Sequence, residues 1–360
     1  MIDSVCRNQY NLNMQTRKIF ILSVILIASF ILLYSYSCKP AGNDVAGDAS
    51  SPTETVTEDN NGSPVDEATP EEYNRIESIP VNAVKMTPAT DLYPPILHSD
   101  EFYDPVPMPW PINTAGGEDS PFIMPDGKTF YVFFTPDVSI PAEKQVLDGV
   151  TGIYVSHLLE NGDWSEPQRV SFGDGLSLDG CAFVQGNRIW FCSAREGYNG
   201  IHWFTADNVD GKWQDLKFSN LNMLEGYEVG ELHITSDGNE LYFHSSRPGG
   251  MGGYDIWMCR NVDGEWQEPI NVEIVNSPDT DGWPYVSQDG RELWFTRFYH
   301  GSPALFRSIR INEEWQEPEL IISQFAGEPT LDNAGNLYFT HHYYENAVML
   351  EADIYVAMKK

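Results

Sequence analysis

The chain has 360 residues, and its 53 acidic and 21 basic side chains give a formal net charge of −32 at pH 7. This balance excludes nonspecific nucleic-acid binding, because neutralising phosphates requires clustered Lys and Arg. It also argues against adhesion to anionic lipid through a basic patch, while cationic or neutral ligands and simple solubility remain open. With 41% hydrophobic and 13% aromatic residues, the chain can bury a large core.

The first 38 residues have the pattern of an export signal. Arg17 and Lys18 precede an apolar run over 19–33, and Cys38 follows shortly after it. This pattern is typical of a signal peptide, and the cysteine resembles the lipidated residue of a bacterial lipobox. We therefore predict cleavage and lipidation at Cys38. An uncleaved membrane helix over 19–36 and plain secretion remain alternatives. All three place the rest in the bacterial envelope, periplasmic or at the cell surface, because the positive flank stays inside.

Residues 39–82 are predicted to be a disordered acidic linker. The segment is rich in Ser, Thr, Pro, Gly, Asp and Glu and has almost no aromatic residues. Such a composition cannot bury enough apolar surface to offset the entropy of ordering the chain. The folded part is therefore expected at 83–360.

Within 83–360, three elements repeat in phase. The first is a turn before an aromatic-rich strand, and its glycines are Gly127, Gly186, Gly238, Gly290 and Gly335. Glycine accepts the positive φ that a tight hairpin requires. The second is a further short strand. The third begins with Trp164, Trp213, Trp266 or Trp315 and carries a proline in three of its four copies, which indicates an edge strand. Each repeat therefore predicts one four-stranded propeller blade.

Five copies of the first two elements but only four of the third leave the last blade without an outer strand. The segment 102–105, Phe-Tyr-Asp-Pro, precedes the first blade and has the character of the missing strand. Its addition would remove an open edge. The sequence thus predicts an all-β, monomeric fold: a single five-bladed β-propeller of four-stranded antiparallel blades, closed by an N-terminal strand that completes the last blade.

The third repeat resembles a known family. Residues 238–257, with Ser-Ser-Arg-Pro-Gly-Gly-Met-Gly-Gly-Tyr-Asp at their centre, are similar to the WD40-like repeat of TolB-type propellers. The resemblance extends over about 100–360. It implies a propeller fold in the bacterial envelope and, by analogy, binding of a protein or an envelope polymer.

Candidate binding residues lie on the face where long loops are expected, at 136–151, 195–200, 247–254, 298–303 and 341–352. An acid enters each innermost strand there: Asp119, Asp179, Glu231, Asp281 and Glu328. Basic and aromatic candidates at the same rim are Arg195, Arg247, Arg297, His341, His342, Trp283, Tyr299 and His300.

These acids have three possible roles. They can pair with the arginines and staple the ring, bind a sugar, peptide amine or cation, or include a catalytic carboxylate pair of a glycoside hydrolase. We expect a non-enzymatic protein that binds an envelope protein or polysaccharide, and keep a hydrolase that uses two of these acids at the channel mouth as the alternative. No cysteine or histidine spacing indicates a metal site, and no cofactor is expected. Cys181 and Cys192 flank a hairpin and could be bonded or remain thiols.

Overall fold

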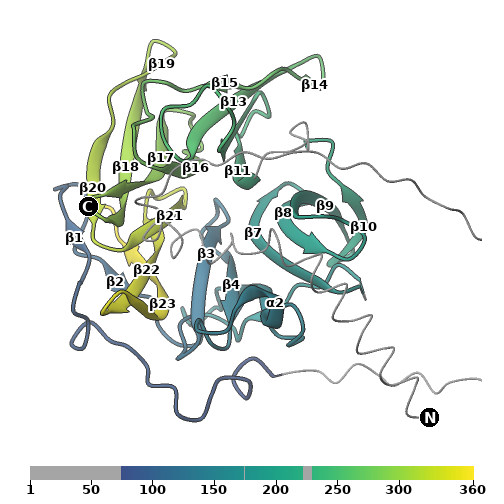
Figure 1. Cartoon of the computed structure of the whole chain (residues 1–360), viewed down its shortest axis with the longest axis vertical. Coiled ribbons are helices and arrows are strands. Elements are labelled where there is room, and N and C mark those ends of the chain that lie inside the picture. Colours follow the sequence, from purple (N-terminus) through teal and green to yellow (C-terminus); the bar gives the residue numbers. More distant parts are fainter. Residues whose placement is uncertain (1–73, 174, 222–228) are drawn as a thin grey trace, which may run out of the picture.

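The computed structural model describes residues 74–173, 175–221 and 229–360, and these are almost entirely β-structure (Figure 1). The export signal, Cys38 and the linker up to residue 73 lie outside the described residues. The all-β prediction is confirmed. The helix α2 (Ala142–Gln145) has four residues, and no helix in the described ranges is long and apolar enough to cross a bilayer.

The strand pairings group into five antiparallel units, which we call blades one to five, arranged around a common centre (Figure 1). Blade one contains β3 (Gly117–Ile123), β4 (Thr129–Thr135), β5 (Gly152–His157) and β6 (Gln168–Arg169). Blade two contains β7 (Ser177–Gln185), β8 (Arg188–Arg195), β9 (Ile201–Val209) and β10 (Lys212–Phe218). Blade three contains β11 (Val229–Ile234), β12 (Glu240–Ser245), β13 (Asp255–Val262), β14 (Glu265–Trp266) and β15 (Ile270–Asn271).

Blade four contains β16 (Asp281–Val286), β17 (Glu292–Tyr299), β18 (Ser302–Ile311), β19 (Glu314–Trp315) and β20 (Glu319–Ser323). Blade five contains β21 (Ala326–Leu331), β22 (Leu337–Glu345) and β23 (Val348–Ala357). A single parallel pairing, Ala352 with Gly117, joins blades five and one. The first strand of each blade is the innermost, so β3, β7, β11, β16 and β21 surround the centre.

The predicted hairpin turns between the first and second strands are confirmed. All five turn glycines have positive φ, between 60° and 80°. In blade one the Gly127 amide donates to the Met124 carbonyl at 2.8 Å, and in blade three the Gly238 amide donates to Thr235 in the same way. This is the backbone geometry that selects glycine at the position.

Proline divides the outer strand of a blade. In blade three, the Trp-Gln-Glu-Pro copy at 266–269 separates β14 from β15, and each pairs with β13 on its own. In blade two, Leu216 replaces the proline and β10 is continuous, with an irregularity between Gln214 and Lys217. The difference follows from the missing N–H of proline, which cannot join the ladder.

The N-terminal strand closes the ring as predicted, although its regular part lies slightly later than 102–105. β2 (Val106–Pro107) pairs antiparallel with β23, and Phe102 forms an isolated bridge with Lys359. The Phe102 side chain is fully buried and packs edge-to-face with the Trp294 ring, with the two ring centroids 6.0 Å apart. The segment thereby links the last blade to blade four as well as completing it.

Residues 74–98, which we call the strap, run over blades one, five and four. β1 (Ile96–Leu97) adds to the outer strand β20 of blade four. Arg75 is buried in blade one against Glu118, although it belongs to the segment predicted as linker. Contacts between the strap and the propeller therefore begin at Arg75 rather than at residue 83.

Two of the five predicted long loops are tight hairpins. Only residues 300–301 separate β17 from β18, and only 346–347 separate β22 from β23. The prediction of loops at 298–303 and 341–352 is wrong because these polar stretches continue the strands. Asn346 and Ala347 both have positive φ, as a two-residue hairpin turn requires.

Candidate functional site at the central channel

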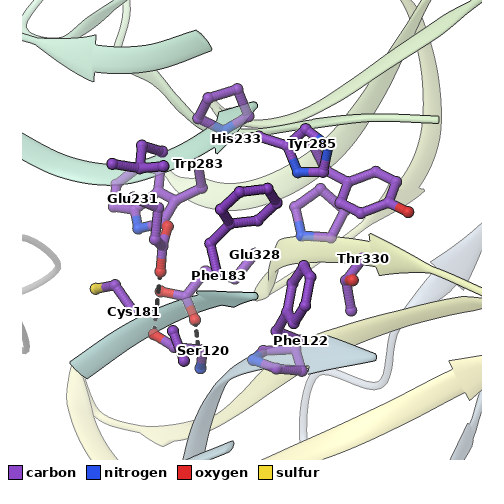
Figure 2. A pocket seen from close by; sticks show the side chains of 15 residues that line it. Ser120, Phe122, Cys181, Phe183, Glu231, His233, Trp283, Tyr285, Glu328 and Thr330 are labelled. Atoms are coloured by element: carbon purple, nitrogen blue, oxygen red, sulfur yellow. Dashed lines mark hydrogen bonds between the residues drawn. The ribbon is translucent and has the colours of Figure 1, made fainter. Parts of the chain in front are cut away.

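The five innermost strands enclose a narrow cavity of about 40 Å³ at the centre of the ring (Figure 2). Each strand contributes three consecutive residues to its wall. Ser120, Glu231 and Glu328 gather at one end, whereas Phe122, Phe183, Tyr285 and Thr330 lie toward the other (Figure 2). A water needs roughly 10–15 Å³ of such space. The cavity therefore holds a few waters and no sugar ring.

Each innermost strand has a β-bulge at this cavity. The ladder shifts register between Asp119 and Phe122 in β3, and at corresponding positions in the other four strands. Four residues in these bulges have positive φ: Ser120 (47°), Cys181 (56°), Trp283 (53°) and Glu328 (58°). Such backbone is unfavourable for these residue types and re-aims the side chain. The bulges thus direct polar groups toward the channel at a conformational cost, which is typical of functional sites.

The five predicted acids are not equivalent in position. Asp179 and Asp281 lie one residue before the bulge, and each pairs with an arginine of the next strand. Asp179 accepts two hydrogen bonds from Arg195, at 2.9 and 3.1 Å, and Asp281 accepts one from Arg297 at 2.5 Å. Burial raises the pKa of Asp281 and Arg297 opposes that rise. These two acids therefore join the first strand of their own blade to the second by an ion pair.

Blade one has the same staple in a different form, which sequence reasoning missed. Glu118 occupies the position of Asp179 and Asp281, and its partner is Arg75 of the strap at 2.8 Å. Both side chains are buried, and burial raises the pKa of Glu118 to about 7. Glu118 was overlooked because its cation is supplied from a segment read as linker.

The remaining three acids meet around Ser120. The Ser120 hydroxyl donates to Glu231 Oε1 at 3.0 Å, and the Ser120 amide donates to Glu328 Oε2 at 2.8 Å (Figure 2). Asp119 precedes Ser120 in β3. The second oxygen of Glu231, Oε2, is buried and accepts no hydrogen bond from the described residues. Three carboxyl groups from blades one, three and five thus share one small, poorly solvated space.

Their environments drive the pKa values of these acids apart. Burial raises the pKa of Glu231 and of Glu328 well above the ordinary range, and the charge of Asp119 adds to both shifts. Burial also acts on Asp119, but its interactions with the nearby His342 imidazole and with Glu328 outweigh it and lower the pKa of Asp119. The cluster therefore favours the ionised form of Asp119 and the protonated forms of Glu231 and Glu328.

Two of the predicted histidines, His341 and His342, are neighbours in β22. They point in opposite directions, because successive side chains of a strand alternate between its faces. His342 Nε2 lies 3.8 Å from Asp119 Oδ1, so it belongs to the cluster. His341 Nε2 lies 2.8 Å from Asp91 Oδ2 of the strap. His341 therefore anchors the strap and is not part of the channel site.

Three further candidates have mainly packing contacts. Arg247 lies over the ring of Trp257, with its guanidinium carbon 5.0 Å from the centroid. Tyr299 and His300 contact each other at the tip of the β17–β18 hairpin, with centroids 4.1 Å apart. None of the three lines the channel cavity.

Trp283 does line the cavity. Its amide donates to His244 Nδ1 at 3.1 Å, and the two rings are 4.8 Å apart. Burial lowers the pKa of His244 to about 3, which keeps the imidazole neutral and able to accept this bond. Trp283 is therefore an aromatic wall residue at the bulge of β16, beside Glu231 (Figure 2).

Ser120 and Cys181 are the channel residues that sequence reasoning missed. A usable signal was present, because a proline follows the bulge residue in three blades, as in Ser120-Pro121, Trp283-Pro284 and Glu328-Pro329. Cys181 and Cys192 are buried free thiols. The hydrogen bond between them, together with burial, raises the pKa of Cys181. Among the described residues, no group of three or more His, Cys, Asp or Glu is arranged to hold a metal ion.

No family model and no curated protein matches the chain. Solved structures with similar folds include TolB from Acinetobacter baumannii, 14% identical over 69% of this chain and 56% of its own length, with a TM-score of 0.41. The catalytic domain of the Coprinopsis cinerea GH62 α-L-arabinofuranosidase is 10% identical, over 68% and 91%, with a TM-score of 0.43. An endo-arabinase from Bacteroides thetaiotaomicron is 16% identical, over 67% and 93%, with a TM-score of 0.43. These similarities do not choose between a binding protein and a hydrolase.

Proposed function

We propose that this chain is a non-enzymatic propeller of the bacterial envelope, anchored through Cys38, that binds a protein or polysaccharide ligand at the polar end of its channel. The observation that carries the proposal is the buried, unpaired Oε2 of Glu231 beside Asp119 and Glu328. A buried polar oxygen without a hydrogen-bond partner is costly, and a ligand group that pairs with it would remove that cost. A protonated amine, on a peptide or an amino sugar, supplies both the donor and a charge opposite to that of Asp119.

The position of the cluster supports access by such a group. Ser120 precedes Phe122 in β3, and Glu328 precedes Thr330 in β21, so the polar end lies toward the starts of the innermost strands. The loops between second and third strands reach the same face, and the longest of them, 136–151, contains α2. A ligand held by these loops could place one amine at the channel entrance.

A glycoside hydrolase is the second candidate, because opposite pKa shifts in neighbouring carboxyl groups are the pattern of an acid and a base. The hydrogen bond that lowers the pKa of Asp119 and raises that of Glu328 argues against it for this pair. Retaining enzymes hold their two carboxyl groups about 5–5.5 Å apart and inverting enzymes hold them farther apart. Direct contact leaves no room for the reacting sugar carbon between them.

Calorimetric titration with a short lysine peptide and with glucosamine tests the proposal. We expect Glu231→Gln to weaken binding of at least one probe about tenfold or more, roughly 1.4 kcal/mol. The exposed Glu160→Gln makes the same substitution away from the channel and should bind as the wild type. A panel of glycans should yield no product. Product that forms with wild type and Glu160→Gln, but not with folded Glu328→Gln, would establish the hydrolase instead.

A further inference from the structure

A second, larger cavity lies between the strap and the segment 107–115, which leads from β2 into blade one. Its volume is about 920 Å³, and it shares no wall residue with the channel. Small-molecule sites in proteins typically have about 300–1,000 Å³ and mostly apolar walls with few polar groups. This cavity has the size and place of such a site.

The cavity wall is apolar and adaptable. Met86 of the strap and Met108 of the opposite segment both line it, and methionine side chains adjust to irregular apolar ligands. Pro80, Pro88 and Pro107 add wall surface without backbone N–H groups. Val81 and Trp110 also line the cavity and leave 106% and 61% of their surfaces exposed, so an apolar ligand would cover apolar surface that now faces water.

The polar groups in the wall are already paired within the protein. The Met86 amide donates to Glu351 Oε2 at 2.8 Å, and the Met108 amide donates to the Ile354 carbonyl at 2.8 Å. The Asn113 side-chain amide donates to the carbonyls of Met108 and Ile354. Lys85 is held by Glu351 and Asp353. A ligand therefore gains little from hydrogen bonding here and is selected mainly by apolar contact.

Charge and shape narrow the ligand further. Among the wall residues, the acids Glu77 and Asp353 outnumber the cation Lys85, which disfavours an anionic group in the ligand. The strap bounds the cavity on one side and the segment 107–115 on the other, and a space between two chain segments suits a linear ligand. We propose that this cavity binds one acyl chain of a lipid with a neutral head group.

Two sources could supply the acyl chain. One is a separate lipid of the membrane. The other rests on the proposed function and is the acyl group on Cys38, because the strap enters the structure at Asn74, close to Ile76 in the cavity wall. The intervening residues 39–73 join that group covalently to the strap, which gives it an effective concentration of about millimolar order at the cavity.

Fluorescence quenching tests the site directly. The full chain with Cys38→Ser, which cannot carry an acyl group, is titrated with a monoacylglycerol whose chain is brominated, below the concentration at which the probe aggregates. Bromine quenches tryptophan on contact, so we expect saturable quenching that falls sharply in Trp110→Phe. Absence of saturable quenching, or equal quenching in Trp110→Phe, would overturn the proposal.

A matched pair of strap variants checks the location. Ile79→Asp places a charge in the cavity wall and should weaken binding of the brominated probe at least tenfold. Val84→Asp lies on the same strap, is 79% exposed and is not in the wall, so it should bind like the parent. Equal affinities in these two variants would contradict the assignment. Thermal unfolding of both variants shows whether the strap still folds, and Trp110→Phe remains informative if Ile79→Asp does not.

A comparison with the lipidated protein shows which of the two sources supplies the acyl chain. If its own acyl group occupies the cavity, the lipidated protein will not take up the probe, whereas the Cys38→Ser protein will. If both bind equally, the ligand is a separate lipid. Glu231→Gln should leave the quenching unchanged, so a failure at the channel and a failure at this cavity can be told apart.

Discussion

Arg75 donates a hydrogen bond from its guanidinium to Glu118 Oε1 at 2.8 Å, and both side chains are buried between the strap and blade one. The same guanidinium donates to the carbonyls of Pro111 and Ile112. This single residue therefore fixes the start of the strap and compensates the buried Glu118 of β3. Removing one partner of a buried ion pair leaves the other uncompensated, which is far more destabilising than losing a surface pair.

Replacing Arg75 by methionine should lower the free energy of unfolding by about 3–5 kcal/mol. The loss should increase with pH. Burial holds the pKa of Glu118 near 7, above its unfolded value, so the folded state favours the protonated acid and loses stability as pH rises from about 4.5 through 7. Without Arg75 the pKa rises further, because Arg75 lowers it. Denaturant titrations at pH 5 and pH 8 measure both effects.

Glu118→Gln in the Arg75→Met background provides the control for that prediction. It removes the titrating group while keeping its size, so the difference between pH 5 and pH 8 should shrink. If the difference in free energy of unfolding between Arg75→Met and the wild type does not change with pH, the stability loss comes from packing alone.

Closure of the ring predicts unequal effects at two adjacent positions. Phe102 is fully buried against Trp294, so Phe102→Ala should cost about 3–5 kcal/mol through lost burial and a cavity. Tyr103 is 60% exposed, and Tyr103→Ala should change stability by no more than about 0.5 kcal/mol. Chemical unfolding of both variants measures this difference. A stable, monomeric protein lacking 98–112 would contradict the closure altogether.

The sequence predicted the propeller well because each blade repeats the same local chemistry. The Asp-Gly turns, the aromatic strands and the Trp-x-Glu-Pro outer strands each act within one blade, and the structure has each of them. The predicted closing strand followed from counting outer strands rather than from any local pattern, and its pairing with β23 agrees.

The site was harder to predict because it depends on register and on distant partners. One residue of shift in a bulged strand separates Asp179, which staples its blade, from Asp119, which joins the channel cluster. Sequence spacing to the hairpin glycine could not reveal the bulge. The partners of Glu118 and His341 come from the strap, far away in the chain, so no repeat-based alignment could have supplied them.

The anchor prediction can be separated into its alternatives with one substitution. Cys38→Ser should release the exported protein from the membrane fraction if the chain is a lipoprotein, because a Ser hydroxyl cannot accept the thioether-linked lipid. An uncleaved helix over 19–36 would keep the variant in the membrane fraction. Fractionation followed by mass measurement of the mature N-terminus tells these cases apart, and the thermal stability of the propeller should be unchanged in either.

Binding of an amine at the channel should become tighter as pH rises. Burial keeps Glu231 and Glu328 protonated above the ordinary pKa of glutamate, whereas a bound cation favours their ionised forms. Binding should therefore release protons, and affinity should increase with pH until both glutamates ionise in the free protein or the ligand amine loses its proton.

Calorimetry of the lysine peptide in buffers with different ionisation enthalpies measures the number of protons released. Glu231→Gln should reduce that number, and Glu160→Gln should not. Proton uptake instead of release would show that the amine does not reach this cluster.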